Sequence, residues 1–218
     1  MVARHSKHGT PPRSRAASAR ERIDQTSYEL FSHHGIRAVG VDTVAARSGV
    51  AKMTLYRHYP SKDKLALAFL RRREELWTRA WLQTEVERRG RTPGEKLLTV
   101  FDVFDKWFRR SDFEACSFIK ALLEHGDRRH PVRYAAQAHI KTIRVFLKQL
   151  AADAGVQDAD GFAKQWQMLM MGSIIAAYAG DQDAARRAKQ IGALILAHEG
   201  VALARRRGVP PAPSRFRG

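Results

Sequence analysis

The stretch of residues 40–64 constrains the fold of this chain more than any other. Gly49 separates two short amphipathic segments there, and the second segment ends at Pro60 before another helical pattern begins. Glycine tolerates the left-handed backbone of a tight turn, and proline cannot continue a helix. Ser61 is a good N-cap for the segment that follows. This order predicts a helix-turn-helix, whose second helix enters the major groove of DNA.

The residue types in this stretch divide into a buried side and an exposed side. Val44, Ala45 and Leu55 are spaced to share a small core, with Val50 reaching into it from the turn. The outer side offers donors for phosphates and base edges, and apolar surface for thymine methyl groups. The candidate DNA-binding residues are Lys52, Met53, Thr54, Tyr56, Arg57, His58 and Lys62. The last of these lies in a first helical turn, which favours a phosphate.

Residues 18–64 resemble the DNA-binding domain of the tetracycline-repressor-like (TetR) family of bacterial transcription regulators. The resemblance rests on Ile23, Leu30, Phe31 and Gly35, on Val44-Ala45 and Gly49-Val50, and on the strings 54–59 and 61–65. It implies that Lys52, Met53 and Tyr56 contact bases or thymine methyl groups. It also implies that Thr54, His58 and Lys62 hold mainly phosphates.

The sequence departs from the pattern of that family in two ways. Gly40 and Val41 stand where its members usually carry Ser or Thr, so that phosphate contact falls to a backbone N–H or is absent. Asp42 lies where a basic or base-contacting residue is common. Its carboxylate either accepts from a cytosine amino group or complements the helix dipole.

The charge of the chain agrees with a polyanionic partner. The 218 residues carry a formal net charge of +17, with an isoelectric point near 10.7. Such a balance is the electrostatic footprint of nucleic-acid binding. Much of it lies at the two ends, where we expect a disordered basic arm over 1–17 and a disordered basic tail over 205–218. The arm either contacts DNA or adds only non-specific affinity; the tail binds DNA or keeps the protein soluble.

The rest of the chain shows helical periodicity without an alternating strand pattern. Helices are expected over 18–34, 61–89, 113–125, 131–152, 160–179 and 183–205, and another from Thr92. In the long helix from Ser61, the residues expected to face inward are Leu65, Phe69, Leu76 and Trp77. We therefore predict an all-α fold. It has a three-helix N-terminal domain over 18–64 and a larger effector-binding and dimerisation domain over 65–204.

Residues 113–198 also resemble, more loosely, the effector-binding domain of one TetR subgroup, through the strings 115–124, 130–133 and 180–188. The family implies a homodimer built by the last two long helices. The candidate interface residues are Met168, Met171, Gly172, Ile175, Ala188, Ile191 and Ile195. These stripes either form a symmetric four-helix interface or face their own core. A dimer would read a palindromic operator on double-stranded DNA.

A small-molecule pocket is expected in the second domain. The candidate effector residues are Phe104, Trp107, Phe108, Cys116, Phe118, Trp166 and Met170. Aromatic and soft side chains of this kind line ligand pockets, and they also fill ordinary cores. Cys116 is the single cysteine, which excludes an intramolecular disulfide and suits a reducing cytoplasm. It is either a thiol sensor or a buried core residue.

The sequence carries no Gly-rich nucleotide loop, serine-hydrolase elbow or zinc-protease motif, so we expect neither an enzyme nor a bound cofactor or metal. It also shows no apolar signal core and no confident membrane span, which favours a cytoplasmic protein. The preferred interpretation is a dimeric repressor, released from its operator when an unknown effector tilts the helix that starts at Ser61. The alternatives are a non-specific basic DNA-binding protein and an activator of the same fold.

Overall fold

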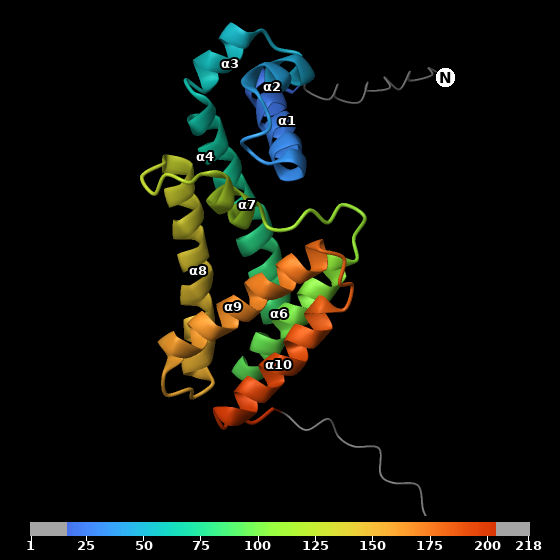
Figure 1. Ribbon diagram of the computed structural model, residues 1–218, viewed down its shortest axis with the longest axis vertical. Coiled ribbons are helices and arrows are strands. Elements are labelled where there is room, and N and C mark those ends of the chain that lie inside the picture. Colours follow the sequence, from blue (N-terminus) through green and yellow to red (C-terminus); the bar gives the residue numbers. More distant parts are fainter. Residues whose placement is uncertain (1–16, 204–218) are drawn as a thin grey trace, which may run out of the picture.

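The computed structural model describes residues 17–203, and its regular secondary structure over that range is entirely helical (Figure 1). The predicted all-α class is therefore confirmed. The expected tail over 205–218 lies outside the described residues, as does the expected arm over 1–17 apart from Ala17.

The N-terminal part consists of α1 (Ala19–His34), α2 (Val41–Ser48) and α3 (Lys52–His58). Ser18 and Glu21 form a capping box at the start of α1, each side chain accepting from the backbone N–H of the other. Gly49 ends α2 with φ +64°, in the left-handed conformation that the turn requires. The predicted helix-turn-helix is thus present, with its turn at the predicted glycine.

The predicted long helix from Ser61 is present as three consecutive segments: α4 (Lys62–Arg73), the π-helical η1 (Glu74–Gln83) and α5 (Thr84–Arg89). The Ser61 hydroxyl caps α4 by accepting from the Lys64 N–H. Leu76 was expected to face inward but is 48% exposed. The wider turns of a π-helix shift the phase of the side chains, so that Thr78 and Leu82 are buried in this segment instead.

The larger part comprises α6 (Pro93–Phe108), α7 (Ser117–Glu124), α8 (Pro131–Asp153), α9 (Ala159–Tyr178) and α10 (Ala184–His198). In Figure 1, α9 crosses in front of α8, and α10 lies beside α6. Trp166 is fully buried at the centre. A Cβ added at Gly192 would lie 2.7 Å from that indole, so α10 approaches α9 closely only because this residue has no side chain.

Within residues 17–203, one hydrophobic core contains residues of both parts. Phe31 and Leu55 pack in the same cluster as Phe118 of α7 and Val132 of α8. Packing is therefore continuous across the domain boundary expected at residue 64. Among residues 17–203, no three His, Cys, Asp or Glu side chains gather in a metal-binding arrangement. In the same range, no helix combines the length and the apolar character needed to cross a membrane.

Candidate nucleic-acid interface and ligand pockets

Helix α3 presents the predicted DNA-binding residues at the surface of the N-terminal part. Leu55 is fully buried, and Tyr59 at the end of the helix is 6% exposed, so one side of α3 is fixed in the core. Met53 on the other side is 72% exposed. Lys52, Arg57 and His58 are also exposed, while Thr54 and Tyr56 are half-buried. Six of the predicted residues thus lie on the exposed or half-buried side of a short helix whose other side is fixed in the core.

Asp42 forms an ion pair that the sequence did not indicate. Its carboxylate lies 2.8 Å from the ammonium group of Lys52, and both side chains are exposed. The hydrogen bond and the charge of Asp42 raise the pKa of Lys52. Asp42 also lies in the first turn of α2, where a negative charge complements the helix dipole. The first residue of α3 is therefore paired with an acid from the preceding helix.

Lys62 differs from the other candidate DNA-binding residues. Its ammonium donates to the Arg37 carbonyl oxygen at 3.0 Å, and burial lowers its pKa. Lys62 therefore holds the loop between α1 and α2 in this conformation. Gly40 is the N-cap residue of α2 and makes no side-chain hydrogen bond. This is the region in which members of the resembled family usually carry Ser or Thr.

We expect the Asp42→Asn variant to bind duplex DNA about three- to tenfold more tightly than the parent at low salt. The substitution removes an acid beside the phosphates and frees Lys52 to contact them. Asp153→Asn, at the far end of α8, makes the same change of charge and serves as the control. Fluorescence anisotropy at two salt concentrations measures the effect. Weaker binding to the specific duplex alone would show instead that Asp42 accepts from a base.

The predicted effector residues do not share one pocket. Four of them, Phe104, Cys116, Phe118 and Met170, line a central apolar cavity of about 50 Å³. Trp107 lines a different pocket, beside which Phe108 lies half-buried. Trp166 stacks on Phe162 within the core. Drug-sized ligands occupy about 300–1,000 Å³, so the central cavity is too small for one in this conformation.

Cys116 lies at the edge of the central cavity, directly before α7. Burial raises the pKa of its thiol. The thiolate is the reactive form of cysteine, so this environment disfavours reaction with oxidants and electrophiles. These observations favour the core role over the sensor role.

His139 is a buried polar residue of the central cavity that sequence reasoning missed. Its ring stacks on Phe118 with centroids 3.4 Å apart, and Nε2 lies 3.2 Å from the Thr78 hydroxyl. Burial is the main cause that lowers the pKa of His139 to about 4, despite the nearby Glu74 carboxylate. The imidazole is therefore neutral near pH 7. A single histidine in an amphipathic helix carries no sequence signal for such a role.

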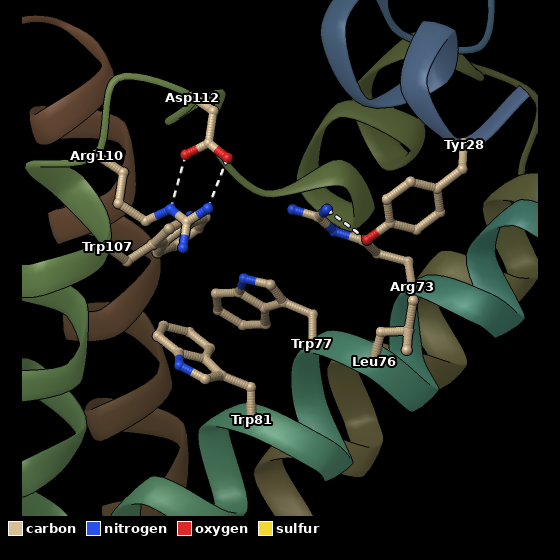
Figure 2. A pocket seen from close by; sticks show the side chains of 8 residues that line it. All are labelled: Tyr28, Arg73, Leu76, Trp77, Trp81, Trp107, Arg110 and Asp112. Atoms are coloured by element: carbon tan, nitrogen blue, oxygen red, sulfur yellow. Dashed lines mark hydrogen bonds and ion pairs between the residues drawn. The ribbon is translucent and has the colours of Figure 1, made fainter. Parts of the chain in front are cut away.

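A larger pocket of about 350 Å³ lies where α1 meets the C-terminal part (Figure 2). Only Trp107 of its residues was among the predicted effector contacts. The side chains that line it are Tyr28, Arg73, Leu76, Trp77, Trp81, Trp107, Arg110 and Asp112. The spacing of Trp77 and Trp81 was the available sequence signal, but it is equally typical of a helix packed on a core.

An exposed apolar stripe runs along α9 and α10. We call Met168, Gly172, Ile175, Ile191 and Leu194 the α9/α10 stripe. Met168 is 73% exposed and Leu194, which was not predicted, is 71% exposed. Nothing lies within 4 Å of a Cβ added at Gly172. Of the other predicted interface residues, Met171 and Ile195 are half-buried, and Ala188 lies in the core of its own subunit.

Comparison with known proteins agrees with this architecture. Residues 25–69 match the family of bacterial regulatory proteins described as tetR. The regulator YjdC of Escherichia coli is 24% identical over 158 residues, which span 71% of this chain and 81% of that protein. The activator FasR of Mycolicibacterium smegmatis is 48% identical over 44 residues, 20% of each protein.

A solved structure shows the same fold over most of the chain. SCO4454, a TetR-family transcriptional regulator from Streptomyces coelicolor, superposes with a TM-score of 0.76 at 27% identity. The match covers 83% of this chain and 95% of that protein. The family match contains α2 and α3 with the exposed residues described above. This chain is therefore a DNA-binding transcriptional regulator whose residues 25–69 match the tetR family and whose fold is that of a TetR-family regulator.

Proposed function

We propose that the protein is a homodimeric cytoplasmic repressor that binds a palindromic operator and is released by a small-molecule effector. The observation that carries the DNA-binding part is the exposed face of α3, opposite the fully buried Leu55. A helix anchored in this way can enter a major groove while its neighbours contact the backbone. Lys52 and Arg57 supply cations there, and Met53 supplies apolar surface.

The α9/α10 stripe supports the dimer. Large apolar side chains exposed on two neighbouring helices mark an interaction surface when they are contiguous. Gly172 adds room for close approach of a partner helix. Two copies joined through these helices form a symmetric four-helix interface, and they present two α3 helices to successive major grooves.

The long helix formed by α4, η1 and α5 supports release by an effector. It begins at Ser61, shortly after α3, and its middle segment supplies Trp77 and Trp81 to the larger pocket. A ligand that binds one tilt of this helix better than another shifts the population toward that tilt. The separation of the two α3 helices then no longer matches the operator. A differential affinity of about 1–3 kcal/mol is sufficient.

Activation is the second candidate function. FasR, whose name describes an activator, matches this chain over 44 residues. The sign of regulation depends on where the operator lies relative to the promoter, and the same DNA-binding geometry serves both. Reporter expression from the native promoter, with and without the protein, distinguishes repression from activation.

The decisive experiment is fluorescence anisotropy with DNA flanking the protein's own gene, compared with scrambled duplex of equal length at two salt concentrations. We expect specific binding that survives the higher salt. Tyr56→Ala should lower affinity for the specific duplex about ten- to a hundredfold, because a contact of about 1–3 kcal/mol to bases is lost. Arg91→Ala removes an exposed charge before α6 and is the control. Equal binding to both duplexes, lost with salt, would indicate non-specific coating instead.

A further inference from the structure

Three indole rings form the floor of the larger pocket. The ring centroids of Trp77 and Trp81 lie 5.1 Å apart, and those of Trp77 and Trp107 lie 4.5 Å apart. Figure 2 shows these rings facing the same space, with Tyr28 on its opposite side. We call the eight-residue site the tryptophan pocket. Its volume of about 350 Å³ is within the range of small-molecule sites.

The charged groups of the tryptophan pocket are unbalanced. Arg110 and Asp112 form a two-fold ion pair, with both N–O distances 2.7 Å. Arg73 donates to the Tyr28 hydroxyl at 2.8 Å, and no ion pair within residues 17–203 neutralises it. In Figure 2 no dashed line reaches an indole nitrogen, so the three indole N–H groups have no partner among the lining residues. The site therefore offers one uncompensated cation and several free donors.

This combination selects among ligand classes. The indole planes are inclined by 53° between Trp77 and Trp81 and by 59° between Trp77 and Trp107, so they offer both faces and edges for packing against an aromatic group. An aromatic cage alone would also suit an organic cation, but the uncompensated charge of Arg73 would repel one. A carboxylate suits the site better, because guanidinium and indole N–H groups both donate hydrogen bonds to it.

The location of the pocket links it to both parts of the protein. Tyr28 belongs to α1 of the DNA-binding part, whereas Trp107 belongs to α6. Trp77 and Trp81 lie on η1, and π-helical segments occur frequently at functional sites. A ligand that fills the pocket therefore touches α1, η1 and α6 together.

We propose that the tryptophan pocket binds an aromatic carboxylate, with its rings among Trp77, Trp81 and Trp107 and its carboxylate on Arg73. The assignment of this ligand as the effector rests on the proposed function; the binding site itself does not. Binding brings the ligand against Tyr28 of α1, so that occupancy and the position of the DNA-binding part become coupled.

Three probes of one shape and different charge test the proposal on the full-length protein. They are biphenyl-4-carboxylate, the neutral biphenyl-4-carboxamide and the cationic biphenyl-4-methylammonium, measured by calorimetry and by quenching of tryptophan fluorescence. Three of the four tryptophans line the pocket, so binding is expected to quench most of the emission. The carboxylate should bind about tenfold or more tighter than the amide, as expected for a charge-assisted hydrogen bond. Equal affinities, or tightest binding by the ammonium, would overturn the proposal.

Two variants locate the contacts. Arg73→Gln should reduce the affinity of the carboxylate to that of the amide and leave the amide unchanged. Trp81→Ala should lower the affinity of both the carboxylate and the amide. Arg71→Gln makes the same charge change two residues earlier, where the side chain is exposed and outside the pocket, and it is the control. Carboxylate binding that survives Arg73→Gln would contradict the assignment.

Operator binding separates this inference from the proposed function. If the carboxylate binds through Arg73 and also weakens operator binding, both are supported. If it binds through Arg73 but operator affinity is unchanged, the site is supported and its effector role is contradicted. If the protein recognises no specific duplex even without a probe, the proposed function is contradicted. The relative affinities of the three probes still test whether the tryptophan pocket binds an aromatic carboxylate.

Discussion

Leu194→Glu is expected to convert the protein into a folded monomer whose operator affinity is lower by about a hundredfold or more. Leu194 is 71% exposed within its subunit, so the substitution removes little packing from the core. In the proposed dimer, the same position faces the partner helices, where two symmetry-related carboxylates would be buried together. Burying unpaired charge is strongly unfavourable, so association is lost. Each monomer then holds only one half-site.

Sedimentation velocity and operator anisotropy measure the two effects side by side. Val145→Glu is the matched control, because Val145 is an apolar residue of α8 that is 59% exposed and lies outside the α9/α10 stripe. It should leave the molecular mass and the operator affinity unchanged. Circular dichroism confirms that both variants remain helical. A Leu194→Glu variant that stays dimeric would move the interface away from this stripe.

The features that the sequence predicted correctly are set by local chemistry. Gly49 occupies a left-handed turn, and Ser61 caps the helix that follows. Each depends on a few consecutive residues, so each is visible in the sequence. The exposed side of α3 follows for the same reason, since burial of Leu55 fixes the direction of its neighbours.

The features that the sequence did not reveal depend on distant elements. The π-helical turns of η1 rotate the side chains that follow Glu74 relative to an α-helix, and Leu76 is therefore exposed. The tryptophan pocket joins Tyr28 to Trp107, and no periodicity within one helix indicates that meeting. Ala188 was assigned to the dimer interface by its helical spacing, yet its small side chain lies in the core of its own subunit. An alanine fits either side of a helix, so the spacing could not decide between them.

The second large effect concerns α7, which connects the central cavity to the DNA-binding part. Phe118 at its start lines the cavity. At its end, one carboxylate oxygen of Glu124 accepts from the backbone N–H groups of Ile36 and Arg37, at 2.9 and 3.0 Å. Lys120, between them, donates to the Ser32 carbonyl oxygen at 3.0 Å. The loop between α1 and α2 is therefore held by charged side chains of α7.

We expect Glu124→Ala to destabilise this contact by about 2 kcal/mol, because two hydrogen bonds to a charged acceptor are lost and Ile36 is buried. Amide exchange at Ile36 and Arg37 should accelerate about thirtyfold, as that free energy implies if exchange occurs through opening of this contact. Glu124→Gln keeps one acceptor oxygen and should show an intermediate effect. Leu123→Ala, at a neighbouring position that is 74% exposed, should leave exchange unchanged.

Gly35 tests the same contact from the other side. It has φ +81°, and a Cβ added there would overlap with Glu124 Oε1. Gly35→Ala should therefore displace the carboxylate and accelerate exchange at Ile36 and Arg37, as Glu124→Ala does. Because both changes break one contact, the double variant should be less destabilised than the sum of the two single variants. Strict additivity would show that Gly35 acts only through its own backbone conformation and independently of the Glu124 contact.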